Sequence, residues 1–566
     1  MDELSESLRE RILHARDTDS LPRSEPISSY RNVGELLEAH ADRYEEKVFL
    51  ISYSDSGQRK EYTYGEILEE VRRTANMLLA SGLGRGDRIA VVSSNRPEVV
   101  IQYLAAWLTG AVVVPVNTGE DDRRIAYVLN RSRASLAFCE EQHLARLIAL
   151  RGEAPQLKTI IQTDGQAEPS LPRYRDEIAR QSTRFRPPAT VGPEDEALIV
   201  YTSGTTGHPK GVVLDQYDLL SDAMAIAEWH RLSADQRMMC VLPLHHVNGI
   251  VVTLVTPLVA GGSVVLNQRF HTEKFFERIS TEGVHVVSVV PTLLQFLLHA
   301  RPSLDAYKLG HFRHLICGAG PLTVELAARF EQETGLRIVH GYGLSETTCY
   351  SCFLPIDLSP AEHRRWMSRH GFPSIGVPLP VNEMAIHDDS GSELEEGARG
   401  EIVIRGHNVM KAYDDEPAVN EAAFTHGWFR SGDEGFFLYD EEGRKFFFIT
   451  GRIKEIIIRG GVNISPFEID EILSKMPGVQ AGIAVGFEND WYGEEVGAYV
   501  HLKPDLEISE DQVLAHCRKH LPFGKSPKAV VFGTEIPVTS TGKYQRAKVR
   551  HLFARWKEVQ FKEGST

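Results

Sequence analysis

The sequence predicts an α/β protein with a large N-terminal domain of layered, largely parallel sheets and helices, followed by a small α+β C-terminal domain. The chain has 566 residues, more than one hydrophobic core accommodates. Strand-like and helix-like runs alternate along most of it, which is the pattern of parallel sheets covered by helices. Near residue 450 this alternation gives way to paired β-rich runs and single helices. We therefore expect domains at residues 1–452 and 453–566.

The first clear βαβ unit follows a predicted helix. Apolar residues recur at helical spacing from Ile67 to Leu79, and Gly82 stands where a helix C-terminus favours glycine. The strand-like "RIAVV", the helix-like "PEVVIQYLAAWLTG" and the strand-like "AVVVPV" come next. Further strands are predicted at "ALIVYT", "VHVVSVV", "HLICGAG" and "RIVHGYG". In the C-terminal part, "PFEIDEILSKM" and "EDQVLAHCRKHL" predict helices, and "GIAVGF" and "VGAYVHL" predict strands.

Composition and charge exclude several classes of protein. The formal net charge of −16 disfavours a nucleic-acid or anionic-membrane surface, because both require lysine and arginine. The N-terminus lacks the apolar core of a signal peptide. The apolar segment 249–266 is long enough for a membrane span, but Pro257 and the pair Gly261-Gly262 divide it into a buried helix and a buried strand. We expect a soluble, cytoplasmic protein without a nucleic-acid partner or a membrane span.

The cysteines predict neither a disulfide framework nor a metal site. Six cysteines are too few for a disulfide framework in a chain of this length. Cys349 and Cys352 form one C-x-x-C pair, without further zinc ligands at suitable spacing and without a thioredoxin-like context. Reduced, structural thiols are the expectation.

Three predicted strands lead into glycine-rich polar segments: "SGTTGHPKG" after "ALIVYT", "GAGPL" after "HLIC" and "GYGLSETT" after "RIVH". Ligands of open α/β sheets bind at the carboxyl ends of strands, so one site built from all three segments is expected. The backbone amides, hydroxyls and Lys210 of the first segment suit phosphate. It is not a Walker A loop, because Pro209 replaces the second glycine of that motif and Gly211 replaces its Ser/Thr.

With "LPLHHVNG", "GEIVIRG", "WFRSGD", "GRIKE" and "PVTSTGKYQR", these segments resemble the motifs of adenylate-forming enzymes, in the same order. That superfamily includes acyl-CoA synthetases, aryl-CoA ligases, beetle luciferases and nonribosomal peptide synthetase adenylation domains. The resemblance runs from "YTYGEI" to "TGKYQR" and is greatest to acyl-CoA synthetases. It implies ATP, Mg²⁺ and, as co-substrate, coenzyme A.

The resemblance also implies a role for each motif in binding ATP. The first loop would bind the β- and γ-phosphates, the "GAG" and "GYG" segments would contact adenine, and Ser345 would contact the α-phosphate. Glu346 would hold Mg²⁺, Asp433 would accept the ribose hydroxyls, and Arg452 would bind ribose or phosphate. Ser345 departs from the threonine that is usual in the family but keeps the hydroxyl. The implied nucleotide-binding residues are Thr202, Ser203, Gly204, Thr205, Thr206, Gly207, Gly318, Ala319, Gly320, Tyr342, Gly343, Asp433 and Arg452.

The implied catalytic residues are Lys543, His246, Lys210 and Ser345. Lys543 would bridge the acyl carboxylate and the α-phosphate, with His246 beside them. In the family the small domain is mobile and rotates about a hinge, here near Lys454, which opens a coenzyme A tunnel. The implied tunnel residues are Gly460, Gly461 and Asn463. Taken alone, His246 would be interpreted as a buried core histidine and Lys543 as an exposed turn lysine.

The predicted acyl pocket includes Asn248, Gly249, Val252 and Gly341. Its surroundings are apolar with few hydrogen-bonding groups, which favours a fatty or other largely hydrophobic acid. The segment "HHVNG" lacks the aspartate that amino-acid-activating members place there, which argues against an α-amino acid.

Free coenzyme A is the favoured acceptor, and a phosphopantetheine arm on an acyl carrier protein is the alternative. The basic stretch 363–370 could contact either one, although a solvated helix face is the simpler interpretation. A luciferase-like oxidation and a non-catalytic nucleotide-binding scaffold are less favoured. The scaffold would be expected to lack Lys543, Glu346 or Asp433, and all three are present.

Overall fold

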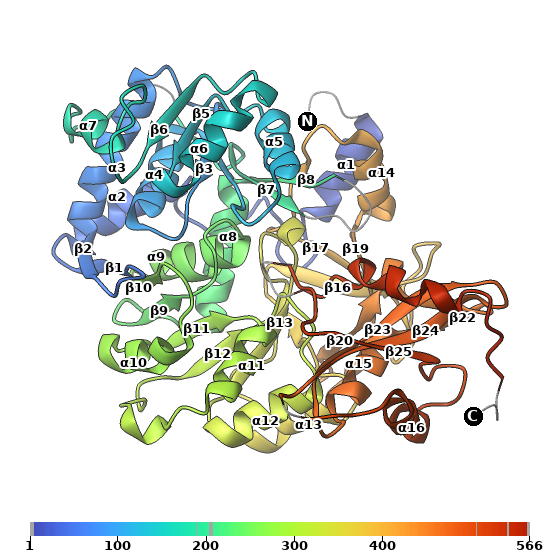
Figure 1. The fold of residues 1–566 in the computed structure, drawn as a ribbon. Coiled ribbons are helices and arrows are strands. Elements are labelled where there is room, and N and C mark those ends of the chain that lie inside the picture. Colours follow the sequence, from blue (N-terminus) through green and yellow to red (C-terminus); the bar gives the residue numbers. More distant parts are fainter. Residues whose placement is uncertain (1–4, 188–189, 203–207, 505, 540–542, 563–566) are drawn as a thin grey trace.

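The computed structural model describes residues 5–187, 190–202, 208–504, 506–539 and 543–562. Two large mixed sheets and one smaller antiparallel sheet form the N-terminal part, and a separate five-stranded sheet forms the C-terminal part (Figure 1). The predicted fold class is confirmed. The sheets are less uniformly parallel than the sequence predicts, because each large sheet ends in antiparallel strands and the third is antiparallel throughout.

The first large sheet has nine strands, parallel from β13 to β1. Their order is β15 (Val377–Pro378), β14 (Cys352–Phe353), β13 (Ile338–Tyr342), β12 (His314–Cys317), β11 (Val286–Val289), β9 (Arg237–Cys240), β10 (Ser263–Asn267), β1 (Val48–Tyr53) and β2 (Arg59–Thr63).

The second large sheet has seven strands, parallel from β7 to β6. Their order is β18 (Ala412–Tyr413), β8 (Lys210–Asp215), β7 (Glu196–Thr202), β4 (Val112–Pro115), β3 (Arg88–Val92), β5 (Leu136–Cys139) and β6 (Thr159–Gln162).

Helices cover both large sheets. One core extends through most of the N-terminal part, and a second, smaller core lies between the second large sheet and the helices at residues 122–131 and 141–150. The helices of this part are α1 (Glu6–Ala15), α2 (Val33–Tyr44), α3 (Tyr64–Ala80), α4 (Pro97–Thr109), α5 (Asp122–Arg131), α6 (Glu141–Leu150), α7 (Tyr174–Ala179), α8 (Gln216–Trp229), α9 (Thr256–Val259), α10 (Thr272–Glu282), α11 (Pro291–Ala300), α12 (Val324–Thr334), α13 (Pro360–Ser368) and α14 (Pro417–Ala423).

Local sequence explains how the predicted helices begin and end. The Thr63 hydroxyl and the Glu66 carboxylate form a reciprocal capping box at the start of α3. After its last residue the chain reaches Gly82 at φ +76°, as the C-terminal glycine predicts. The predicted buried helix and strand in the segment 249–266 are also confirmed: the helix starts as a π-helix, η2 (Asn248–Val255), continues as α9 and is followed by β10. Among the described residues, no helix is long and apolar enough to cross a membrane.

The third sheet joins the two parts of the chain. Its strands are β16 (Asn382–His387), β17 (Gly400–Gly406), β19 (Phe429–Tyr439) and β20 (Lys445–Arg452). The C-terminal sheet follows, with β21 (Ile457–Arg459), β22 (Val462–Ile464), β23 (Val479–Asn489), β24 (Gly493–Leu502) and β25 (Ala529–Phe532). Helices α15 (Pro466–Ser474) and α16 (Glu510–His520) pack on it around a core of their own.

The basic stretch 363–370 lies mostly in α13. Trp366 stacks on Phe446 of β20 at 3.9 Å between ring centroids, while Arg364 is exposed. This packing supports the interpretation of a helix with one solvated basic face. The six cysteines are all buried and unbonded to one another, in line with structural thiols.

Candidate active site

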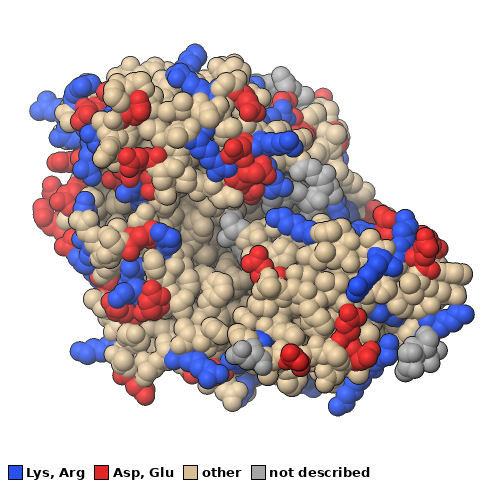
Figure 2. Space-filling model, in the orientation of Figure 1, with Lys and Arg blue, Asp and Glu red and all other residues tan. Residues whose placement is uncertain are grey.

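The candidate site lies where the carboxyl ends of the central strands face the C-terminal part of the chain. Figure 2 shows a hollow at the centre of this face, lined mostly by uncharged residues, with charged side chains on the outer surface. Strands β12 and β13, which lead into two of the predicted loops, are parallel neighbours, so their carboxyl ends lie at the same edge of the first large sheet. The predicted loop after β7 lies mostly outside the described residues.

Strand pairing sets the two ends of the predicted phosphate loop. Thr202 at the end of β7 pairs with Lys210 at the start of the antiparallel β8. Ser203, Gly204, Thr205, Thr206 and Gly207 lie outside the described residues, so their roles stay predictions.

The Lys210 ammonium lies 5.3 Å from the ring centroid of Tyr413. The Tyr413 hydroxyl in turn donates to Glu346 Oε1 at 2.8 Å. Tyr413 thus links the predicted phosphate lysine to the predicted Mg²⁺ ligand, a connection that the sequence did not indicate.

Asp433 connects three strands of the site. Its side chain is fully buried on β19, opposite Arg452 at the end of β20. The Arg452 Nε lies 2.8 Å from Asp433 Oδ1, and the Tyr342 hydroxyl donates to Oδ2 at 2.6 Å. Asp433 raises the pKa of Arg452 further, and burial together with Asp433 raises the pKa of Tyr342 well above its usual value. The three residues are therefore joined by one ion pair and one hydrogen bond to a charged carboxylate.

The glycine-rich turns lie against neighbouring backbone. A Cβ on Gly343 would lie 1.9 Å from the Cys349 carbonyl oxygen, so no larger residue fits there. Ala319 has φ +62°, in the left-handed region, between Gly318 and Gly320. Ser345 begins a one-turn 3-10 helix, η4 (Ser345–Thr347), which also carries Glu346.

Lys543 reaches this site from the C-terminal part of the chain. Burial and then Arg452 lower the pKa of its ammonium to about 8, against the opposing influence of Asp433, Glu346 and Glu455. Burial, His245 and Lys543 hold the pKa of His246 well below its usual value, so this imidazole is neutral near pH 7. Lys543 thus lies among residues from separate motifs about 90 to 300 positions earlier in the chain.

Arg546 anchors the turn that carries Lys543. Its Nη1 donates to Asp470 Oδ1 at 3.0 Å and to the Ala484 carbonyl oxygen at 2.8 Å. Its Nε also lies 3.3 Å from Glu455 Oε2. The sequence analysis missed Arg546, although it lies only three residues after the predicted catalytic lysine. Its partners are distant in sequence and gave no local signal.

The predicted hinge and coenzyme A residues lie apart from this cluster. Lys454 is exposed in a short 3-10 helix, η6 (Ile453–Glu455), between β20 and β21. Gly460 and Gly461, at φ +56° and +84°, form the exposed turn between β21 and β22, and Asn463 lies on β22. No hydrogen bond or ion pair within the described chain joins these three tunnel residues to the nucleotide residues.

The predicted acyl-pocket residues are all buried. Asn248, Gly249 and Val252 lie on η2, and Gly341 lies on β13. The amide nitrogen Nδ2 of Asn248 donates to the hydroxyl of Tyr350 at 3.3 Å. Tyr350 was not predicted as a pocket residue.

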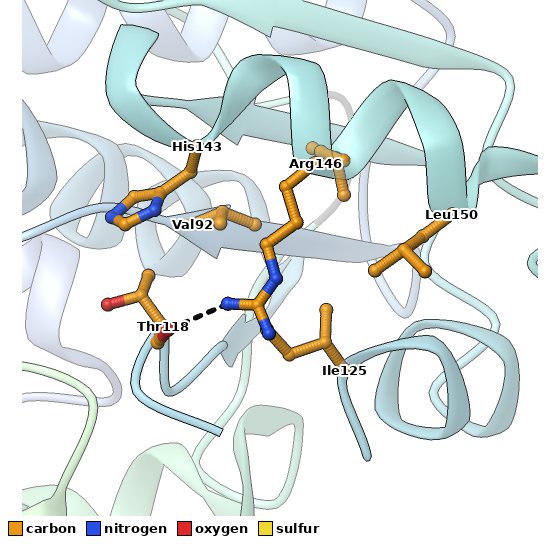
Figure 3. Close-up of a pocket in the computed structure, with 7 residues that line it drawn as sticks. Val92, Thr118, Ile125, His143, Arg146 and Leu150 are labelled. Carbon is orange, nitrogen blue, oxygen red and sulfur yellow. Dashed lines mark hydrogen bonds between the residues drawn. The ribbon is translucent and has the colours of Figure 1, made fainter. Parts of the chain in front are cut away.

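A second depression, between β3 and α6, is remote from these residues. Figure 3 shows Arg146 extending into it, with Nη1 donating to the Thr118 carbonyl oxygen at 2.9 Å. Because the arginine side chain fills the space, this pocket offers no site for chemistry.

Comparison with known proteins identifies the family to which the chain belongs. The sequence profile of the AMP-binding enzyme family matches residues 37–414, and that of the AMP-binding enzyme C-terminal domain matches residues 468–543. The chain belongs to the AMP-binding enzyme family. As a member, it is an enzyme of the AMP-forming acid–thiol ligase type.

Similar members of the AMP-binding family are CoA ligases. Sulfoacetate–CoA ligase from Cupriavidus necator is 33% identical over 93% of this chain and 99% of its own length. Indoleacetate–CoA ligase from Aromatoleum aromaticum is 32% identical over 88% of this chain and 94% of its own. The crystal structure of ATP-bound MatB from Rhodopseudomonas palustris superposes with a TM-score of 0.81 at 28% identity, covering 92% of this chain and 99% of that one.

Proposed function

We propose that this enzyme activates a carboxylic acid with ATP, releasing pyrophosphate, and transfers the acyl group from the acyl-adenylate to the thiol of coenzyme A. The observation that carries the proposal is the position of Lys543 among His246, Glu346, Asp433 and Arg452. Two anions must meet in the first step, and this cluster supplies opposing charge on a preorganised framework.

In the first half-reaction a carboxylate oxygen attacks the α-phosphorus, the new P–O bond forms and the bond to pyrophosphate breaks. In this proposal the Lys543 ammonium would contact both the carboxylate and the α-phosphate, and its position beside Arg452, Asp433 and Glu346 supports that role. Neutral His246 can donate a hydrogen bond without adding charge. Asp433 and Tyr342 would hold the ribose and the adenine, while Lys210 and Ser345 would orient the phosphates. These groups would position the two substrates and neutralise their negative charges, and none would form a covalent bond with the substrate.

Glu346 fits a Mg²⁺ ion that travels with the nucleotide. Tyr413 donates to Oε1 only, which leaves Oε2 available, and Mg²⁺ is usually held by one or two carboxylates together with phosphate oxygens and waters. When bound, the ion would neutralise the phosphates and stabilise the departing pyrophosphate. Lys210, held over Tyr413, would bind the same phosphates from the other side.

The second half-reaction requires the thiol to reach the adenylate, where Lys543 now lies. We propose that the chain divides at residues 452/453 and that the small domain rotates about Lys454, withdrawing Lys543 and bringing Gly460, Gly461 and Asn463 toward the site. The change of sheet between β20 and β21 and the exposure of the turn after β21 support this division. An acyl carrier protein could present the same phosphopantetheine thiol.

One experiment tests the reaction as a whole. The purified protein is assayed for acid-dependent ATP–pyrophosphate exchange with a panel of acids that includes alkanoates and arylacetates, because the sequence favours a largely hydrophobic acid. Coenzyme A or an acyl carrier protein is then added, and thioester formation is measured by mass spectrometry. Exchange followed by acyl-CoA formation is the expected result. Exchange with thioester formed only on the carrier protein would change the acceptor, and no exchange with any acid would exclude the proposed function.

A further inference from the structure

A carboxylate from the C-terminal part of the chain binds the start of a helix in the N-terminal part. Glu471 lies on α15, which packs beside α12. Its Oε2 accepts a hydrogen bond at 2.8 Å from the backbone N–H of Val324, the first residue of α12 and 147 positions away in the sequence. The first N–H groups of a helix have no partner within the helix and carry partial positive charge, so a carboxylate stabilises them. The contact therefore ties the two parts of the chain together.

This contact is largely buried. The Glu471 side chain is 8% exposed, and the Nζ of Lys475, one turn later on α15, lies 3.1 Å from its Oε1. Burial raises the pKa of Glu471, while Lys475 and the backbone N–H groups at the start of α12 act to lower it. The N-cap hydroxyl of α12, on Thr323, accepts from the N–H of Leu326. Glu471 thus serves an N–H group other than the one that the helix's own cap serves.

The neighbouring residue on α15 holds the turn that carries Lys543. Asp470 Oδ1 accepts from Arg546 Nη1 at 3.0 Å and from the backbone N–H of Ala484 at 2.7 Å. Successive side chains of an α-helix point about 100° apart, so Asp470 and Glu471 reach partners on different sides of α15. Two adjacent carboxylates therefore connect α12, through α15, to the segment that contains Lys543.

Helix α12 is itself close in sequence to a predicted nucleotide loop. It begins at Val324, shortly after the glycine-rich segment 318–320 that is predicted to contact adenine. At the start of α15, the Ser465 hydroxyl donates to the carbonyl oxygen of Thr450 on β20, so this helix is held there as well as at Glu471. Contacts at these two points fix the position of Lys543 relative to the N-terminal part of the chain.

Resting on the proposed function, we propose that Glu471 is a positioning residue for the first half-reaction: its contact with α12 docks the small domain in the arrangement that places Lys543 in the site. The rotation proposed for the second half-reaction would move α15 away from α12 and break this contact. Glu471 therefore sets the ratio of docked to withdrawn enzyme without touching either substrate. Its effect on that ratio equals the free energy of the contact, which exists in the docked arrangement alone.

The test compares the two half-reactions in the full-length protein and in Glu471→Ala. ATP–pyrophosphate exchange with the best acid measures the first. Thioester formation from the supplied acyl-adenylate, with coenzyme A or the carrier protein as acceptor, measures the second. Each rate is proportional to the fraction of enzyme in the arrangement that it needs, so the ratio of the second rate to the first follows the ratio of withdrawn to docked enzyme. A hydrogen bond to a charged group corresponds to about ten- to a hundredfold in an equilibrium constant, so this rate ratio should rise by about tenfold or more.

Two further variants make the comparison specific. In Glu471→Gln the amide oxygen can still accept from the N–H of Val324 but carries no charge, so the rate ratio should rise less than in Glu471→Ala. Glu468→Ala is the matched control, because Glu468 lies on the same helix and pairs at 2.8 Å with Lys525, inside the C-terminal part. This substitution should leave the rate ratio unchanged. Thermal unfolding confirms that each variant is folded.

The pH profile of exchange provides a readout that a loss of stability alone would not move. Burial in the docked arrangement is the main cause that lowers the pKa of Lys543 to about 8. Weaker docking exposes the ammonium to water and raises its pKa toward the ordinary value for lysine. The alkaline decline in kcat/KM for exchange should therefore move to higher pH in Glu471→Ala and stay in place in Glu468→Ala.

The outcomes are distinct. An unchanged rate ratio in folded Glu471→Ala would overturn this inference while leaving the proposed function intact. An equal rise in Glu468→Ala would also overturn it, because any change on α15 would then loosen the domain. Exchange with no acid at all in the unaltered protein would overturn the proposed function and this inference with it.

Discussion

Arg452 and Asp433 face each other across the antiparallel strands β20 and β19, with Nε of the arginine 2.8 Å from Oδ1 of the aspartate. Tyr342 donates to the second oxygen from the end of β13, in a different sheet. Arg452 is the last residue of β20, immediately before the proposed division of the chain, and Asp433 also acts on Lys543. The residues predicted to bind the nucleotide, the proposed hinge and Lys543 are therefore linked through one buried carboxylate.

Asp433→Asn should weaken nucleotide binding. The substitution keeps the shape of the side chain and removes the charge that Arg452 and the proposed ribose contact both use. Hydrogen bonds to charged groups contribute about 1.5–3 kcal/mol, so we expect the KM for ATP to rise by about ten- to a hundredfold. Exposed Glu442→Gln, on the turn between the same two strands, is the control. Loss of thermal stability with an unchanged KM for ATP would show that Asp433 is purely structural.

Lys543→Ala should separate the two half-reactions. Because Lys543 neutralises the anions of the first step, ATP–pyrophosphate exchange should fall by about 10²- to 10³-fold. Thioester formation from supplied acyl-adenylate and coenzyme A should remain largely intact, since the proposed rotation withdraws this lysine. Rapid-quench measurement of each half-reaction checks this, with the exposed Lys548→Ala as the matched control. Equal losses in both steps would contradict the assigned role.

The pH profile of the first half-reaction should report Lys543. Its pKa of about 8 means that the ammonium, which is the active form, is lost as the pH rises through that value. kcat/KM for exchange should therefore decline above about pH 8, since this parameter reports the free enzyme. Bound ATP and acid favour the ammonium, so the decline in kcat should come at higher pH. In Lys543→Arg the side chain stays charged; persistence of the same decline in that variant would assign it to another group.

Arg16 should be essential for stability without touching the site. It is buried after α1, where it donates to Asp218 Oδ1 at 2.8 Å and pairs with Asp215, both at the start of α8. Removing one partner of a buried ion pair costs about 3–5 kcal/mol, so Arg16→Ala should lower the free energy of unfolding by that amount. The exposed Arg31, paired with Glu35 on α2, provides the control Arg31→Ala with an expected change below about 1 kcal/mol. Denaturant titration measures both, and similar small losses would refute the role of Arg16.

Much of the site could be predicted because its parts are local in sequence. Tight turns require the glycines of the "GAG" and "GYG" segments, and parallel strands bring their carboxyl ends to one edge of a sheet. These constraints predicted that the loops after β7, β12 and β13 share a site. They also placed the helix ending near Gly82 and the division of the apolar segment 249–266.

Other parts of the site depend on contacts between residues far apart in the chain. Tyr413 reaches Glu346 from β18, Arg546 reaches Asp470 from beyond Lys543, and Tyr350 accepts a hydrogen bond from Asn248. None of the three lies in a pattern that predicts its partner.

The sequence by itself determined the class of the fold, the order of its motifs and the loops predicted to bind the nucleotide, because backbone conformation and strand direction follow from local residue patterns. Only the tertiary structure decided which side chains from distant segments contact those loops and which residues surround Lys543. Such contacts arise from packing between distant segments, where the volume and polarity of neighbouring side chains are matched in space. They produce no periodic pattern in the sequence.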